Sequence, residues 1–217
     1  MSTNREVFGQ IAESWYRVRH WPLLPEELKE LTQRWKQGRL LNVGCAHGPD
    51  FLPFRQGFKL HGIDSAYQMI EQAKVYSSKF NFNVDLAAAD ACYLPFKDNC
   101  FDWVIAVASY HHIKGGLERK TAFLELKRVL KPGGEAFLTV WNRRQPRFWY
   151  KSQEQQVPWN NKGRVLYRYY HLYSYRELRN IIINTGFKII SMKPEKSYRF
   201  PISIFSHNIC ALIRKEL

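Results

Sequence analysis

The sequence predicts an α/β protein with a doubly wound, mostly parallel sheet, and three observations support this prediction. Short apolar runs suited to buried strands alternate with helical patterns from residue 40 to residue 141. The connections between them are short, which favours parallel strands joined by crossover helices. Small or acidic residues follow each run, where ligands bind in open α/β sheets.

The predicted elements form one domain, because 217 residues with 45% hydrophobic content can bury one large core. Residues 1–38 are expected to hold two helices separated by WPLLP, and residues 39–141 to form the ligand-binding core. Residues 142–173 read as an aromatic and basic insertion. Residues 174–217 supply a last helix, capped by Ser174, and further strands. Ser65, directly after Asp64, is likewise expected to cap the helix that follows it.

The charge of the chain suggests a polyanionic partner. Its 33 Lys and Arg residues against 19 Asp and Glu give a net charge of +14. Residues 141–217 carry 15 of the basic and 4 of the acidic residues, and therefore most of the excess. Clustered basic charge is typical of nucleic-acid-binding proteins. A solvated basic surface that binds nothing anionic is the alternative.

The cysteines and the N-terminus point to a cytoplasmic protein without a metal. None of the four cysteines is part of a C-x-x-C motif, so neither zinc nor disulfides are expected. The start MSTNREVFGQ lacks the apolar stretch of a signal peptide. No run of about 18 apolar residues, the length needed to span a bilayer, occurs in the sequence.

The segment LLNVGCAHG, residues 40–48, predicts a ligand-binding turn after the first strand. Asp64 ends the next strand, and a carboxylate there suits a ribose diol because it accepts both hydroxyl protons. Asp90 ends the third strand, and residues 108–112 follow the fourth. The G-x-G-x-x-G register of a nicotinamide dinucleotide site does not fit this turn.

With these segments in order, the chain resembles the class I S-adenosylmethionine-dependent methyltransferases. The motifs are LLNVGCAHG, HGIDSAYQMIEQAK, ADACYLPFKDNCFDWVIA and LKRVLKPGGEAFLTVW. The resemblance implies a Rossmann-like sheet of seven strands, S-adenosylmethionine as cofactor and S-adenosylhomocysteine as product. It also implies that the cofactor-binding residues are Asn42, Gly44, Cys45, Gly48, Asp64, Ser65, Asp90, Ala91 and Ala108.

Two residues depart from the pattern of that family. Asn42 replaces the usual acidic residue, and it brings no charge toward the methionine ammonium. Ala46 replaces the middle glycine and adds a Cβ where backbone approaches ligand. Both changes are expected to weaken cofactor binding, and loss of the cofactor with retention of the fold is the alternative.

Three further stretches resemble the tRNA wobble-uridine carboxymethyl methyltransferases. They are VFGQIAESWYRVRHWPL, SYHHI with the following LKRVLKPGGEAFLTVW, and VPW followed by YRYYHLYSYREL. The resemblance implies methylation of the carboxylate of 5-carboxymethyluridine in the tRNA anticodon. It also implies a small zinc-binding activator subunit, which we expect to pair with an edge strand near Phe80 to Ala88.

The catalytic residues expected in such a site, which would position the carboxylate that accepts the methyl group, are Arg19, His20 and His111. A carboxylate with a pKa near 4 is ionised at neutral pH and needs no general base. The site therefore has to align the reacting groups and balance the acceptor's charge, which these three side chains can share. Of the adjacent histidines, His112 is the one expected to pack against the following helix.

Aromatic and basic residues interleave in the segment from Tyr167 to Tyr173, which suits stacking on unpaired bases. Tyr170 and Tyr173 are alternatively core contacts of an added strand. The predicted substrate- or RNA-binding residues are Tyr16, His112, Arg143, Arg164, Arg168, Tyr169 and His171.

Two other functions fit the same core. A small-molecule methyltransferase would share the cofactor site, although it needs no basic rim. A non-catalytic RNA-binding module of the same fold would account for Asn42 and Ala46. Binding of S-adenosylmethionine separates this module from an enzyme.

Overall fold

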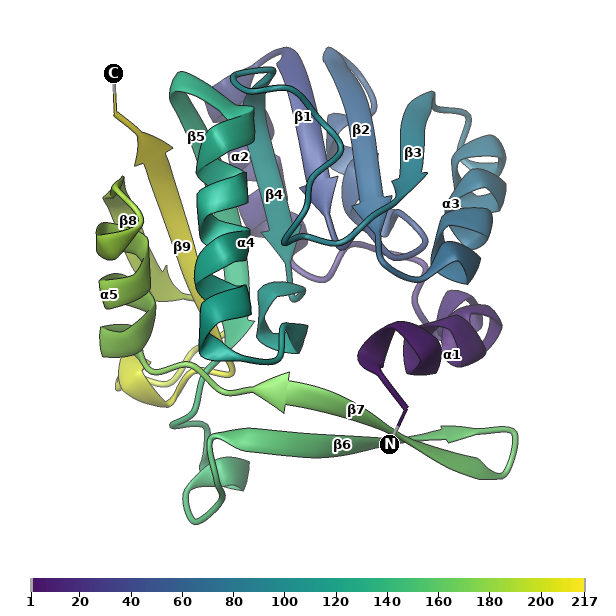
Figure 1. The fold of residues 1–217 in the computed structure, drawn as a ribbon, viewed down its shortest axis with the longest axis vertical. Coiled ribbons are helices and arrows are strands. Elements are labelled where there is room, and N and C mark those ends of the chain that lie inside the picture. Colours follow the sequence, from purple (N-terminus) through teal and green to yellow (C-terminus); the bar gives the residue numbers. More distant parts are fainter. Residues whose placement is uncertain (1, 217) are drawn as a thin grey trace.

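The computed structural model describes residues 2–216 and contains a seven-stranded sheet flanked by helices (Figure 1). The spatial order of its strands is β3-β2-β1-β4-β5-β9-β8. Their bounds are β1 Gly38–Val43, β2 Phe58–Asp64, β3 Val84–Ala88, β4 Phe101–Val107, β5 Leu130–Trp141, β8 Phe187–Pro194 and β9 Asn208–Lys215. The first five pair in parallel, and β9 runs antiparallel to β5 and β8. The predicted doubly wound, mostly parallel sheet is confirmed.

Two helices precede the sheet and one follows Ser174, as the sequence predicts. Their bounds are α1 Asn4–Val18, α2 Pro25–Trp35, α3 Tyr67–Lys79, α4 Gly116–Val129 and α5 Tyr175–Asn184. Four short 3-10 turns are η1 Pro49–Phe54, η2 Tyr110–His112, η3 Pro146–Phe148 and η4 Ser203–Phe205. None of the helices within residues 2–216 is long and apolar enough to cross a membrane.

Two helix starts test the capping predictions. The Ser174 hydroxyl accepts the Glu177 N–H at 3.1 Å, so Ser174 caps α5 as predicted. Our expectation that Ser65 caps the third helix was wrong. The cap position of α3 is Ala66, and its N–H donates instead to the Asp64 carboxylate.

The sheet has a buried core on each face, because side chains of successive strand residues point to opposite sides. On one face, α4 and α5 bury Phe123, Leu126 and Ile182 completely. On the other face, α2 and the turn η1 bury apolar side chains that include Leu28 and Phe51. The cores fix the sheet and leave the carboxyl ends of its strands for ligand binding.

The hairpin of β6 Glu154–Asn161 and β7 Arg164–His171 lies below those carboxyl ends, next to α1 (Figure 1). Val7 and Ile11 of α1 are buried in one cluster with Leu166 of β7. This hairpin is the main element of the predicted insertion at 142–173. Together α1 and the hairpin form a layer that faces the ligand-binding edge of the sheet.

Candidate active site

A cavity of about 510 Å³ lies between the carboxyl ends of the strands and the layer of α1 and the hairpin. The sheet contributes residues that follow β1, β2, β3 and β4, as expected for a doubly wound fold. The lining includes the predicted residues Arg19, Gly44, Asp64, Ser65, Asp90, Ala91, Ala108, His112 and Tyr169. The structure therefore brings together about half of the predicted site residues.

Asp64 is the acidic residue most closely fixed in this cavity. Its Oδ2 accepts the Ala46 N–H and its Oδ1 accepts the Ala66 N–H, both at 2.9 Å. Burial raises the pKa of Asp64 to about 6, although both hydrogen bonds lower it. Each oxygen keeps a free lone pair, so the carboxylate can still accept hydroxyl protons from a ligand.

The turn after β1 is held tightly beside Asp64. The Gly44 and Cys45 N–H groups both donate to the Ile63 carbonyl at 2.8 Å. Gly44 has a φ of 72°, and a Cβ there would lie 2.5 Å from the Ser109 Cβ, so only glycine fits without a shift. Ala46 lines the cavity with a φ of 48°, which is strained for alanine.

Three residues that were predicted to bind the cofactor do not line the cavity. Cys45 is buried beside Phe51 and Gly62, and burial raises the pKa of its thiol. Gly48 closes the turn by donating its N–H to the Cys45 carbonyl. Asn42 is buried inside β1, and within residues 2–216 neither end of its amide has a hydrogen-bond partner. These positions shape the turn from behind.

The structure exchanges the expected places of the two adjacent histidines. His111 is 1% exposed and outside the cavity lining; its ring stacks on Tyr170, with 4.9 Å between centroids. His112 lines the cavity, and its Nδ1 lies 3.0 Å from the Tyr169 carbonyl. The prediction that His111 faces the acceptor and His112 packs away was therefore wrong, because the turn η2 directs the second ring into the cavity.

Arg19 lines the cavity, but its charge already has a partner. Its Nη2 lies 3.1 and 3.0 Å from the two carboxylate oxygens of buried Asp50, which also accepts the Leu23 N–H. The Arg19 carbonyl accepts a hydrogen bond from the ring of His47. Arg19 thus holds the segment after α1 in place.

His20 and Tyr16 do not reach the cavity, contrary to prediction. The His20 carbonyl accepts the Tyr76 hydroxyl proton, and its ring packs edge-on against Tyr16. Tyr16 also packs edge-on against His47 and Tyr76. These aromatic side chains lie outside the cavity lining and pack against one another behind it.

The predicted RNA contacts of β7 divide by burial. Tyr169 lines the cavity, whereas His171 is 3% exposed, with Nε2 2.6 Å from Glu177 Oε1. Arg168 is 6% exposed, with its guanidinium 5.0 to 5.5 Å from the ring centroids of Trp15, Trp159 and Tyr170. Predicting Arg168 and His171 as RNA contacts was wrong, because their side chains are covered by protein.

Tyr170 and Tyr173 are buried as well, which confirms the alternative that they are core contacts. Arg143 and Arg164 are exposed, outside the cavity. These two remain predicted RNA contacts.

Sequence reasoning missed the cavity residues of α1, the loop after η2 and β6. They are Asn4, Arg5, Phe8, Trp15, Lys114 and Gln156. The spacing of Asn4, Phe8, Trp15 and Arg19 by four, seven and four residues marks one stripe of the helical segment. That stripe was the available signal. Across residues 2–216 no group of three or more His, Cys, Asp or Glu side chains is placed to hold a metal.

Comparison with known proteins agrees with this geometry. Residues 41–138 match the family model described as a methyltransferase domain. The chain has the fold of the class I methyltransferases, and its core is similar to them in sequence. The seven-stranded, mostly parallel sheet is the one expected for this class.

Two curated relatives and one solved structure show how far the similarity extends. A putative methyltransferase of Encephalitozoon cuniculi is 29% identical over 86% of both chains. The tRNA (carboxymethyluridine(34)-5-O)-methyltransferase of Saccharomyces cerevisiae is 28% identical over 71% of this chain. This chain spans only 55% of the length of that yeast relative.

The solved structure is the 1,6-didemethyltoxoflavin-N1-methyltransferase of Burkholderia thailandensis, which contains bound S-adenosylhomocysteine. It superposes with a TM-score of 0.66, covers 100% of this chain and 92% of its own, and is 14% identical. At that identity the likeness shows the fold alone.

Proposed function

We propose that this methyltransferase transfers the methyl group of S-adenosylmethionine to the carboxylate of 5-carboxymethyluridine at the wobble position of tRNA. The observation that carries the proposal is the position of Tyr169. This residue belongs to the segment most specific to the tRNA enzymes, and it lines the same cavity as Asp64 and Asp90. The yeast relative named for this reaction supports the substrate.

The cavity fits S-adenosylmethionine in size and chemistry. Its 510 Å³ lie within the range of cofactor pockets. Asp64, with a free lone pair on each oxygen, would accept the ribose hydroxyls, and Asp90 with Ala91 would border the adenine. Gly44 lines the cavity and would border the methionine part. When bound, S-adenosylmethionine supplies an electrophilic methyl group on a sulfonium.

The histidine in the cavity suits an acceptor that needs no proton removed. Burial lowers the pKa of His112 to about 3, so its ring is neutral at pH 7 and a weak base. Its Nδ1–H donates to the Tyr169 carbonyl, which leaves Nε2 as a hydrogen-bond acceptor. A neutral ring forms no ion pair with the acceptor carboxylate, whose oxygens stay free to attack.

Cations at the rim can balance the acceptor's charge. Arg5 of α1 and Lys114 after η2 are both exposed and both line the cavity. The Lys114 ammonium lies 5.9 Å from the Tyr169 ring centroid. Since Arg19 is paired with Asp50, these two side chains take over the role that the sequence suggested for Arg19.

We further propose that the activator subunit pairs with β3. Among the described residues 2–216 this strand has β2 as its single neighbour, and β3 is one edge of the sheet as predicted. Phe82, Val84 and Leu86 are half-buried along it. An added strand would cover them and satisfy the free backbone groups. The four cysteines are free thiols, which suits the reducing cytoplasm where we place the reaction.

Transfer of labelled methyl groups to carboxymethylated tRNA tests the reaction, with and without an activator subunit. We expect a base-labile labelled product, since a methyl ester hydrolyses in mild alkali. Label that resists mild alkali contradicts a carboxylate acceptor. We also expect saturable binding of S-adenosylmethionine by calorimetry, and its absence would favour the non-catalytic RNA-binding module.

A further inference from the structure

Two loops outside the cavity present large aromatic side chains to solvent. Trp149 and Tyr150 follow the turn η3 and are 54% and 99% exposed. Phe200 precedes the turn η4 and is 58% exposed. Trp149 also packs against Phe205, with 5.5 Å between ring centroids, so the two loops touch. Aromatic side chains gathered and exposed in this way are typical of an interaction surface.

The same loops carry unpaired positive charge. The cations are Arg143, Arg144, Arg147, Lys151 and Arg199. The segments 142–153 and 196–208 contain no Asp or Glu, and none of the five cations has a carboxylate within salt-bridge distance in residues 2–216. The Arg147 guanidinium lies 4.3 Å from the Trp141 ring centroid, in a cation–π arrangement.

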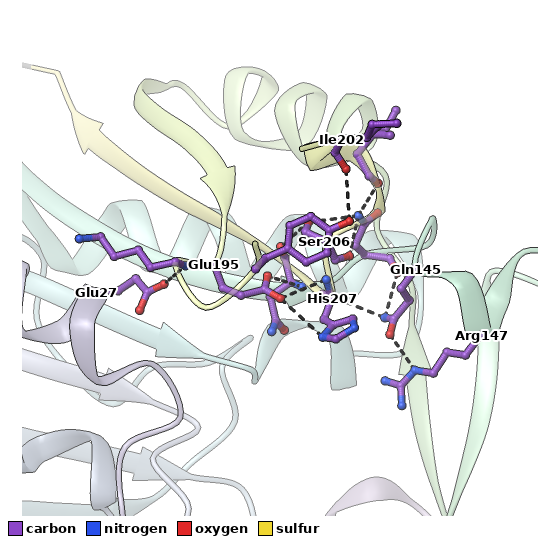
Figure 2. A network of polar contacts seen from close by, with 12 residues as sticks. Glu27, Gln145, Arg147, Glu195, Ile202, Ser206 and His207 are labelled. Carbon is purple, nitrogen blue, oxygen red and sulfur yellow. Dashed lines mark hydrogen bonds and ion pairs between the residues drawn. The ribbon is translucent and has the colours of Figure 1, made fainter. Parts of the chain in front are cut away.

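A buried polar network holds the two loops together (Figure 2). The Asn142 amide donates to the carbonyls of Ile204 and Ser206 at 2.8 and 2.9 Å. Gln145 Nε2 donates to the His207 carbonyl at 3.3 Å, and Gln145 Oε1 accepts from Arg147 Nε at 2.7 Å. These bonds fix the backbone beneath the exposed side chains.

Glu195 completes this network from the side of β8. Its carboxylate is 3% exposed and accepts the N–H groups of His207 and Asn208, at 3.1 and 2.7 Å (Figure 2). A surface whose backbone is fixed in this way loses little conformational freedom when it binds a partner.

The loops lie at the same edge of the sheet as the cavity. Trp141 at the carboxyl end of β5 pairs with Asn208 at the start of β9, so both loops leave the sheet at this point. The hairpin that supplies Tyr169 to the cavity begins at Glu154, shortly after Lys151. A polymer with one of its units in the cavity can therefore place the adjacent units on the two loops.

We infer that residues 142–151 and 198–205 form a stacking platform for unpaired bases of an RNA whose modified nucleoside occupies the cavity. This inference rests on the proposed tRNA function. Tyr150, Trp149 and Phe200 offer ring faces to the bases, and the surrounding arginines contact phosphates. An anionic membrane surface also attracts aromatic and basic residues, but the position beside a nucleoside-sized cavity favours RNA.

Fluorescence anisotropy with a labelled 12-nucleotide oligouridine and a duplex RNA of equal length tests the platform. We expect Tyr150→Ala with Phe200→Ala to weaken oligouridine binding about tenfold or more and duplex binding by less than twofold. The slope of log affinity for oligouridine against log salt concentration should not change in this variant. Arg144→Ala with Lys151→Ala should lower the slope by about 1 to 2.

The matched control is Tyr67→Ala, a half-exposed tyrosine at the first residue of α3, the helix that packs on β3 at the other end of the strand order from β9 (Figure 1). This control should bind oligouridine like the unaltered protein, and all variants should bind S-adenosylmethionine with unchanged affinity. Equal oligouridine affinity in the platform variant and the control overturns the inference, even if methyl transfer to tRNA occurs. The inference is also overturned if Tyr150→Ala with Phe200→Ala loses binding to phosphatidylserine vesicles and keeps its RNA binding. That result would assign the loops to a membrane surface.

The platform and the proposed reaction fail in different ways. If the platform variant binds oligouridine more weakly but the unaltered protein transfers no methyl group to carboxymethylated tRNA, the platform is supported and the reaction is rejected. Methyl transfer with an unchanged KM for tRNA in the platform variant supports the reaction and rejects the platform.

Discussion

Asn4 of α1 and Tyr169 of β7 are joined by two reciprocal hydrogen bonds. Asn4 Oδ1 accepts the Tyr169 N–H at 2.7 Å, and Asn4 Nδ2 donates to the Tyr169 carbonyl at 2.9 Å. The amide side chain thus pairs with β7 as the backbone of another strand would. It ties the first turn of α1 to the hairpin and closes one wall of the cavity.

Removing this pair should loosen that wall. We expect Asn4→Ala to lower the free energy of unfolding by about 1–2 kcal/mol, because the part-buried Tyr169 N–H loses its partner and the Tyr169 carbonyl keeps only the bond from His112. Its Kd for S-adenosylmethionine should rise several-fold by calorimetry. Gln10→Ala, an exposed position on the same helix, is the control. Unchanged cofactor affinity in Asn4→Ala would mean that α1 does not help to enclose the cofactor.

Asp64 should make cofactor binding depend on pH. Its pKa of about 6 means that the carboxylate gains a proton as the pH falls through 6, and a protonated acid accepts ribose hydroxyls poorly. We expect affinity to fall about tenfold between pH 7 and pH 5. Asp64→Asn should bind weakly at pH 7 and lose this dependence. A parallel pH profile in Asp64→Asn would assign the titration to another group.

The same pKa predicts a trend in stability. Because the folded-state pKa lies above the unfolded value near 3.9, the folded protein holds the proton more tightly. Asp64 should therefore make the free energy of unfolding fall by about 2 kcal/mol as the pH rises from 4 to 6. Urea denaturation of the unaltered protein and Asp64→Asn at both pH values measures the difference.

Arg168 and Arg164 should separate stability from RNA binding. We expect Arg168→Ala to lower the free energy of unfolding by about 2–4 kcal/mol, because the guanidinium packs among three aromatic rings. Arg164→Ala, at an exposed position, should change it by less than about 0.5 kcal/mol. In tRNA-binding titrations, the salt slope should fall by about 1 for Arg164→Ala alone. The reverse pattern would make Arg168 a phosphate contact after all.

Lys114→Ala should weaken binding of the methyl acceptor without changing binding of the cofactor. Lys114 is an exposed cation on the cavity lining, so its loss should raise the KM for carboxymethylated tRNA by about five- to tenfold. The Kd for S-adenosylmethionine should not change, and Lys114→Arg should restore most of the activity. Arg19→Ala should instead destabilise the fold, because Asp50 would stay buried without its cation. An unaltered KM in Lys114→Ala would exclude this lysine from acceptor binding.

Ala46→Gly should stabilise the turn that holds Asp64. The left-handed backbone at Ala46 costs alanine about 1 kcal/mol or more, whereas glycine adopts it freely. After the added entropy of the unfolded chain, we expect a gain of about 0.5 kcal/mol in the free energy of unfolding. Ala88→Gly in the extended β3 should destabilise by a similar amount. A loss of stability in Ala46→Gly would show that the methyl group packs favourably.

The sheet and its ligand-binding edge could be predicted because both follow from local pattern. Alternating strands and helices require parallel crossovers, and the carboxyl-end rule then places Asp64 and Asp90 on the cavity. The same rule places Gly44, which directly follows β1, on the cavity. These predictions needed no knowledge of how distant segments pack.

The cavity wall could not be predicted in the same way. Whether His111 or His112 enters the cavity depends on how the turn η2 meets β7, which no local pattern encodes. Arg168 reads as a surface charge in sequence, but Trp15 of α1 covers it. Both errors arise from contacts between segments that are far apart in the chain.

The bond between Asn4 and Tyr169 spans 165 residues, which has a consequence for how the molecule assembles. Closing a loop of that length costs about 4–5 kcal/mol of chain entropy. Strands β1 to β5 pair within the first 141 residues, so they can form before the hairpin leaves the ribosome. The cavity is completed only when the last third of the chain returns to the first helix. Cofactor binding during synthesis would therefore report the final stage of folding.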